Sequence, residues 1–122
     1  MKIVTDLDQS KKLAEFLPLE SADMFYRNNG VDAKLMWEHN AHKVKYPCWS
    51  LAALFGVLPV MIDYKGSLIR LRIDKGNIGQ DEYAIWYDDL DNGLSTSIAS
   101  EAKNLVDACY EMIIKLHEMG VL

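Results

Sequence analysis

The sequence predicts an α+β fold, and three features of its pattern carry that prediction. The C-terminal quarter is amphipathic with helical spacing, three runs before it resemble β-strands, and a short, almost wholly apolar segment precedes those runs. The chain has 122 residues, of which half are hydrophobic and a quarter are charged. That length and balance are usual for one globular domain, so we predict a single α+β domain over residues 1–122.

The first half of the chain predicts two helices separated by a less regular segment. "DLDQSKKLAEFLP" (6–18) predicts a short helix that Thr5, Asp6 or Asp8 can cap and that Pro18 ends. Within residues 19–45, "ADMFYR" and "AKLMWEHNAHKVKY" each predict either an edge strand of the sheet or irregular structure. Pro47 suits the first turn of a helix, so "CWSLAALFGVLP" (48–59) predicts a buried central helix.

The second half predicts a sheet followed by a helix. Its strands are "VMIDY" (60–64), "SLIRLRID" (67–74) and "EYAIWYD" (82–88), which we expect to form a three-stranded antiparallel meander. In the middle strand apolar side chains alternate with charged ones, so one face packs inward and the other meets water. "DDLDNG" (88–93) lacks oxygen ligands that a calcium loop requires and predicts a strand-to-helix connection.

The last segment, "SIASEAKNLVDACYEMIIKLHEMG" (97–120), predicts the longest helix of the chain. Its apolar residues recur at helical spacing, Ser97 or Ser100 can cap its start, and Gly120 can end it. Because one side of this helix is apolar, we expect it to pack across the inner face of the meander.

The charge of the chain disfavours two classes of partner. Its 18 acidic and 13 basic residues give a net charge of −5, which repels nucleic-acid backbones and anionic membrane surfaces. The longest uncharged apolar run, residues 50–62, contains Pro59 and is shorter than the about 20 residues that span a bilayer. We therefore predict a cytoplasmic protein that does not bind membranes, and a nucleic-acid modulator is only the second alternative function.

Cys48 raises the possibility of catalysis, because "PCWS" is similar to the local pattern around the nucleophile of papain-like proteases. The alternative function is therefore a small cysteine hydrolase or transferase that uses Cys48. The glycines of the longer papain-like pattern are missing, and His117 is the only histidine after the cysteine. The structural interpretation, in which Cys48 and Cys109 are buried apolar thiols, is favoured.

The remaining candidate sites are weaker. His39 and His42 in "WEHNAH" have ligand types that suit zinc, but no paired metal-ligand spacing accompanies them, and histidines in a polar loop are more often exposed to solvent, which is the favoured interpretation. Arg70 and Arg72 form a small basic stripe that an acidic partner or a phosphate could bind, although charged residues on the wet face of a sheet are usual. No cofactor-binding motif is present, so we predict no cofactor.

Two stretches resemble a known group of proteins. "PCWSLAALFGVLP" and "LVDACYEMIIKLHEMG" are similar to signatures of small uncharacterised proteins of Bacteroides-like bacteria and their phages or prophages. The resemblance implies an α+β fold and a phage or mobile-element setting, and it carries over no functional residue. With no convergent set of reactive groups in the sequence, we predict a non-enzymatic accessory protein that binds a host or phage protein and can form homo-oligomers.

Overall fold

The computed structural model describes residues 2–27, 32–35, 46–75, 82–89 and 94–122. These residues form two compact units, residues 1–57 and residues 58–122, which we describe separately. The α+β class predicted from the sequence is confirmed, with three α-helices and two antiparallel sheets among the described residues. That the chain acts as a single domain stays a prediction.

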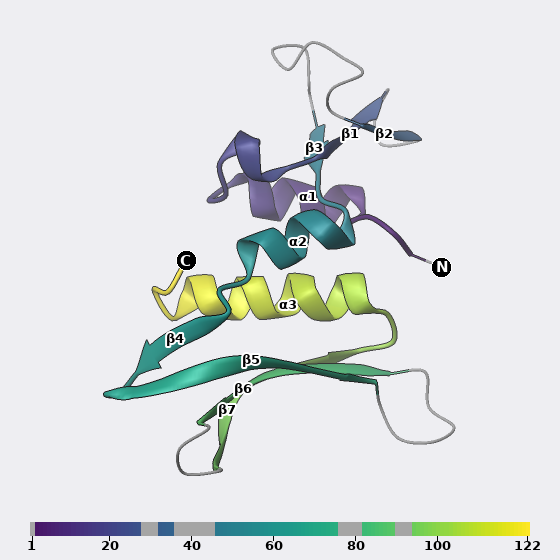
Figure 1. The fold of residues 1–122 in the computed structure, drawn as a ribbon. Coiled ribbons are helices and arrows are strands. Elements are labelled where there is room, and N and C mark those ends of the chain that lie inside the picture. The colour runs from purple at the N-terminus through teal and green to yellow at the C-terminus, as the bar shows by residue number, and fades with distance from the viewer. Residues whose placement is uncertain (1, 28–31, 36–45, 76–81, 90–93) are drawn as a thin grey trace. The chain divides into compact units, whose positions relative to one another are not determined.

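The first unit combines two α-helices with a three-stranded antiparallel sheet of order β2-β1-β3 (Figure 1). Helix α1 packs on β3, and α2 contacts the short 3-10 helix η1. In chain order its elements are α1 (Leu7–Ala14), η1 (Leu19–Ser21), β1 (Met24–Arg27), β2 (Asp32–Leu35), β3 (Tyr46–Cys48) and α2 (Leu51–Val57).

Helix α1 is the predicted N-terminal helix, and Asp6, one of its three predicted caps, begins it. The backbone N–H of Gln9 donates to the Asp6 carboxylate at 2.8 Å, and the Gln9 side chain accepts from the Asp6 N–H at 3.0 Å. This capping box satisfies two of the backbone donors that a helix start leaves unpaired. The helix ends at Ala14, earlier than Pro18, and the N–H groups of Glu15 and Phe16 donate to carbonyls three residues before them, which makes a tighter closing turn.

The prediction that Pro47 begins the central helix is wrong. Residues Tyr46–Cys48 form strand β3, in which Pro47 lies opposite Phe25 of β1. Because β3 is an edge strand, it can hold a proline that lacks an N–H. The helix α2 begins at Leu51 instead, and the Ser50 hydroxyl accepts from the N–H of Ala53 at its first turn.

The less regular segment also differs from the prediction. Strands β1 and β2 lie within residues 19–45 as expected, but they pair with each other and with β3 instead of extending the meander. The pairing partner of β1 is the stretch that was predicted to be helical, so the second sheet could not be foreseen. The expected burial of the central helix holds only in part, because Leu54 is fully buried while Phe55 is 37% exposed.

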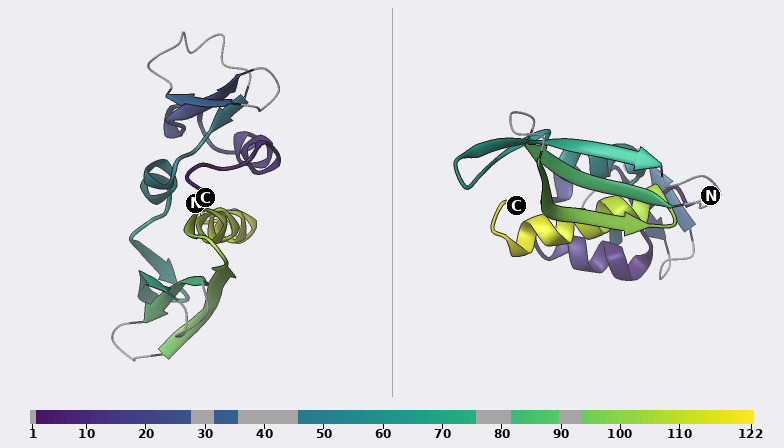
Figure 2. Two further views of the ribbon diagram at one scale, coloured as in Figure 1. Left: turned by 90° about the vertical axis from the view of Figure 1, so that its right-hand side faces the viewer. Right: turned by 90° about the horizontal axis from the view of Figure 1, so that it is seen from below.

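The second unit is a four-stranded antiparallel meander with one long helix on it (Figures 1 and 2). Helix α3 packs on β6 and β7, as the sequence predicted, and no described element of this unit covers the opposite face of the sheet. Its elements are β4 (Met61–Tyr64), β5 (Ser67–Lys75), β6 (Tyr83–Asp89), β7 (Leu94–Ala102) and α3 (Leu105–Glu118).

The fourth strand, β7, occupies residues that were predicted to begin the terminal helix. Ile98 and Ser100 are buried while Ala99 and Glu101 are exposed, which is the alternation of a half-buried strand. The helix α3 therefore begins at Leu105, where Asn104 accepts from the N–H of Asp107 at 2.8 Å. The acidic stretch 88–93 consequently connects two strands, β6 and β7, and not a strand and a helix.

The end of α3 agrees with the prediction. Gly120 has a φ of +80°, and the N–H groups of Gly120 and Val121 donate to the carbonyls of His117 and Leu116 at 3.0 and 2.9 Å. These two bonds form a Schellman motif, for which glycine is suited because it adopts positive φ without steric cost. None of the described helices is both long and apolar enough to cross a membrane.

The β4–β5 hairpin is closed by a two-residue turn at Lys65 and Gly66. Both residues have positive φ, 52° and 82°, which is the combination of a type I′ turn. Tyr64 and Ser67 flank the turn and are paired in register, so they form the first hydrogen-bonded pair of the hairpin. This fixes which backbone groups of β4 point toward β5 and which point away from it.

Candidate functional site

Cys48 lies at the end of β3, where its side chain has no solvent exposure. Burial, together with the negative charge of Asp23, raises the pKa of the Cys48 thiol to about 12. A thiol with that pKa stays protonated at neutral pH, whereas a nucleophilic cysteine needs its thiolate. The second thiol, Cys109, is also buried, and burial raises its pKa to about 12. Both cysteines are thus buried thiols, as the structural interpretation predicted.

Asp23, whose charge helps to raise the pKa of Cys48, accepts hydrogen bonds from the residue before helix α2. Asp23 accepts a hydrogen bond from the backbone N–H of Ser50 at 2.9 Å and a second from the Ser50 hydroxyl. Because Ser50 precedes α2, these bonds tie the loop before β1 to the first turn of that helix. Asp23 therefore stabilises local structure, and its charge acts against ionisation of Cys48.

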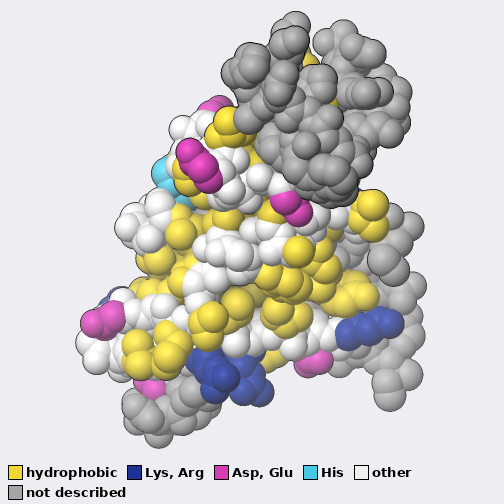
Figure 3. Space-filling model, turned by 45° about the horizontal axis from the view of Figure 1, so that its top comes forward, with side chains coloured by type: hydrophobic (Ala, Val, Ile, Leu, Met, Phe, Trp, Pro, Cys, Tyr) yellow, Lys and Arg dark blue, Asp and Glu magenta, His cyan; other side chains and the backbone are white. Residues whose placement is uncertain are grey.

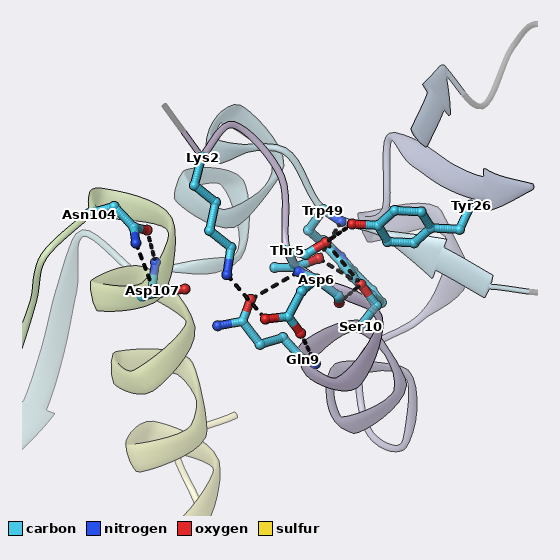
Figure 4. Close-up of polar contacts among 9 residues, drawn as sticks. All are labelled: Lys2, Thr5, Asp6, Gln9, Ser10, Tyr26, Trp49, Asn104 and Asp107. Atoms are coloured by element: carbon cyan, nitrogen blue, oxygen red, sulfur yellow. Dashed lines mark hydrogen bonds and ion pairs between the residues drawn. The ribbon is translucent and has the colours of Figure 1, made fainter. Parts of the chain in front are cut away.

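The buried hydroxyls of the first unit are also paired internally (Figure 4). Thr5 Oγ1 and Ser10 Oγ are 2.8 Å apart, and the backbone N–H of Trp49 donates to Thr5 Oγ1 at 3.1 Å. The Tyr26 hydroxyl donates to the carbonyl of Thr5 at 2.6 Å, and Ser10 Oγ donates to that of Asp6 at 2.6 Å. These bonds hold the N-terminal segment against β1 and β3, and each of these hydroxyls takes part in them.

The structure does not test the metal candidates named from the sequence. His39 and His42 lie outside the described residues. Within residues that the structure describes, no cluster of three or more His, Cys, Asp or Glu side chains could hold a metal ion. His117 lies at the end of α3, where its Nδ1 is 2.8 Å from the carbonyl oxygen of Leu122.

The second unit leaves a different set of side chains exposed to solvent. We call the sheet face opposite α3 the outer face; it carries Arg70 and Arg72, which the sequence placed on the wet side of their strand. The hydroxyl of Ser100 donates to the Ala108 carbonyl in α3, so Ser100 and its register partner Ile85 mark the inner face.

The two arginines of the outer face have different surroundings. Arg72 lies opposite Trp86, and its Nε is 3.9 Å from a carboxylate oxygen of Asp88. The other carboxylate oxygen, Asp88 Oδ1, is shielded from solvent and accepts no hydrogen bond from a described residue. Arg70 is exposed and makes no ion pair with any described residue.

Apolar side chains flank these arginines. Met61 lies opposite Arg70 and is 45% exposed, and Leu68 is two residues before Arg70 on the same face and is 53% exposed. Figure 3 views the molecule from above Figure 1, so the outer face points away from the viewer, and its lower margin shows hydrophobic side chains next to a group of Lys and Arg side chains. The alternating pattern of β5 pointed to the arginines and not to Met61 or Leu68, although Leu68 has the same strand phase as Arg70 and Arg72 and is placed beside them by that pattern.

The comparisons with known proteins give no further guide to this surface. No family model, curated protein sequence or solved structure matches the chain. The resemblance to small phage-type proteins therefore stays a prediction.

Proposed function

We propose that this chain is a non-enzymatic interaction protein that binds another protein through the outer face of its four-stranded sheet. The observation that carries the proposal is the exposure of Leu68 and Met61 around an arginine that has no ionic partner among the described residues. Exposed apolar side chains around arginine and tryptophan are typical of the energetically important centres of protein interfaces.

The chemistry of the outer face indicates the kind of partner that it fits. Arg70 can form a bidentate hydrogen-bonded pair with a carboxylate, and Leu68 beside it can contact an apolar side chain. We therefore infer a protein partner that presents a carboxylate next to apolar side chains, as the accessory factor of a phage or mobile element would find on a host or phage protein.

The burial of Cys48 argues against the alternative of a cysteine hydrolase or transferase. A substrate carbonyl would have to reach a thiol with no solvent exposure, and the raised pKa removes the thiolate that would attack it. The described residues supply no observation that favours this alternative over the interaction protein.

The proposal is tested by replacing Leu68 with a photoreactive amino acid and irradiating the cells that express the protein. A specific adduct with one other protein is expected, and the adduct should be lost when Arg70→Glu is added, because the substitution places a carboxylate against the partner's carboxylate. The purified partner, once identified by mass, should then bind the purified wild-type chain and should not bind the Arg70→Glu variant.

The matched control places the same photoreactive group at Glu111, which is exposed on α3. Equal labelling from both positions, adducts only with other copies of this chain, or labelling from Leu68 that survives Arg70→Glu would each contradict the proposal.

A further inference from the structure

The edge strand β4 exposes apolar side chains on both faces of the sheet. Val60, directly before β4, is 63% exposed, and Met61 is 45% exposed. Met61 pairs with Arg70 on the outer face, whereas Val60 has the strand phase of Ile62, which pairs with Ile69 on the inner face. A partner on one face would cover only one of these two side chains. An additional strand along the edge of β4 would cover both.

The backbone of β4 has hydrogen-bonding groups directed toward that edge. Because Tyr64 and Ser67 form the hydrogen-bonded pair next to the turn, Ile62 also points its N–H and C=O toward β5. The carbonyl of Val60 continues this pattern, since it accepts from the N–H of Leu71 at 2.9 Å. The N–H and C=O groups of Met61 and Asp63 therefore point away from β5, and exposed groups of this kind are a template for another strand.

We propose that a second copy of this chain occupies the edge, with the two β4 strands antiparallel around a two-fold axis at Ile62. A two-fold axis allows three registers that use the outward groups of Met61 and Asp63. An axis at Met61 would place Pro59, which lacks an N–H, opposite Asp63 of the second copy. An axis at Asp63 would place two carboxylates directly opposite each other, which is unfavourable. Only the axis at Ile62 avoids both problems.

The side chains are complementary in this register. Ile62 lies opposite Ile62 of the second copy, and Val60 lies opposite Tyr64 of the second copy on the same face. On the outer face, Asp63 of the second copy lies beside Met61, and Arg70 lies on the other side of Met61. The long side chain of Arg70 can reach past Met61 to the carboxylate of Asp63 in the second copy. Arg70 makes no ion pair with any described residue of its own chain.

This inference goes beyond the proposed function and does not rest on it, because backbone groups of β4 carry it. The two uses of Arg70 are compatible, since a guanidinium has five N–H donors and can bind Asp63 of the second copy and a partner's carboxylate together. Its first test is Ile62→Cys under mild oxidation. Two residues at the axis form a non-hydrogen-bonded pair with Cα atoms about 4.5 Å apart, which is within the range of a disulfide. A disulfide-linked dimer is expected in non-reducing electrophoresis.

The matched control is Met61→Cys, which is more exposed and thus more accessible to oxidant. In the proposed register two Cys side chains at position 61 are diagonal neighbours, with Cα atoms about 7–8 Å apart, so they should form much less dimer. Dimer from Met61→Cys without dimer from Ile62→Cys would overturn the register. Dimer from neither would overturn the proposal.

The second test needs no cysteine and uses sedimentation velocity. Asp63→Arg and Arg70→Asp should each weaken self-association about tenfold or more, because each replaces two attractive pairs by two repulsive ones. Mixing the two variants should restore a dimer of wild-type affinity, since each arginine again meets a carboxylate. The control Asp74→Arg changes the charge of the same sheet face away from the edge and should sediment as the wild type does. A wild-type chain that is monomeric at every concentration, or a mixture that stays monomeric, would overturn the proposal.

Discussion

The paired polar groups of the first unit contrast with the outer face and the β4 edge of the second unit. In the first unit, buried hydroxyls, a carboxylate and the Trp49 indole are bonded to groups of the same unit, so its chemistry is directed inward. In the second unit, the outer face and the β4 edge leave Leu68 and Met61 exposed beside an arginine without an ionic partner among the described residues. This difference is why we place the proposed contacts with other molecules on the second unit.

The largest effect on stability is expected from Trp49→Ala. Trp49 has no solvent exposure, and its indole N–H donates to the Ser21 hydroxyl at 3.0 Å. Truncation of a buried tryptophan leaves a large cavity and should lower the free energy of unfolding by about 3–5 kcal/mol in urea denaturation. Phe55→Ala is the control, because Phe55 is 37% exposed and should lose much less. Equal losses would show that the core of the first unit is not where we place it.

The rate at which Cys48 is alkylated tests whether its thiol is buried and protonated in the folded first unit. Because burial raises the pKa of the Cys48 thiol to about 12, alkylation by iodoacetamide at neutral pH should be slower than that of a free thiol by a factor on the order of a thousand. In denaturant both cysteines should react at the ordinary rate. Fast labelling of the native Cys48→Ala variant would locate the reactive thiol at Cys109, and fast labelling that Cys48→Ala removes would revive the hypothesis of a nucleophilic Cys48.

The same pKa shifts predict how stability depends on pH. The folded thiols bind their protons more tightly than unfolded thiols do, so their contribution is complete below the unfolded pKa near 9 and is lost as the pH rises toward 12. The free energy of unfolding should therefore fall above pH 9, and the fall should be smaller in Cys48→Ala.

A smaller loss is expected from Thr5→Val, which keeps the shape of the side chain and removes its hydroxyl. The backbone N–H of Trp49 then loses its acceptor in a buried position, which should cost about 1–3 kcal/mol. Thr5→Ser is the matched control, because it retains the hydroxyl. If Thr5→Val and Thr5→Ser unfold at the same urea concentration, the buried hydrogen bonds do not stabilise this unit.

The sequence predicted those strands and helices in which apolar residues are buried and polar residues are exposed. The alternation around Ile69 and the helical stripe of α3 reflect burial on one side only, so burial can be inferred from the order of residues. The sequence did not predict β7, because the buried position 100 holds a serine whose hydroxyl bonds to the Ala108 carbonyl. A polar residue satisfied by a distant backbone group cannot be distinguished from an exposed one by sequence pattern.

The candidate site was predictable to a similar extent. Burial of Cys48 follows from its apolar neighbours, and the outward direction of Arg70 and Arg72 follows from strand phase. The exposure of Met61 was not predictable, because it depends on β4 being an edge strand, and that depends on the pairing order of the whole sheet. The prediction that Pro47 begins a helix was wrong because a proline suits both a first helical turn and an edge strand, and only the pairing of the strands distinguishes the two.

The smallest effect on stability is expected where the effect on binding should be largest. Leu68→Ala removes a side chain that is 53% exposed and should change the free energy of unfolding by less than about 0.5 kcal/mol, as surface substitutions usually do. The same substitution at Leu54, which is fully buried in α2, should cost about 2–5 kcal/mol. Urea denaturation of the two variants thus compares one chemical change in an inward-directed and an outward-directed setting. If Leu68→Ala is as destabilising as Leu54→Ala, Leu68 belongs to the core of the chain and the outer face is not a free binding surface.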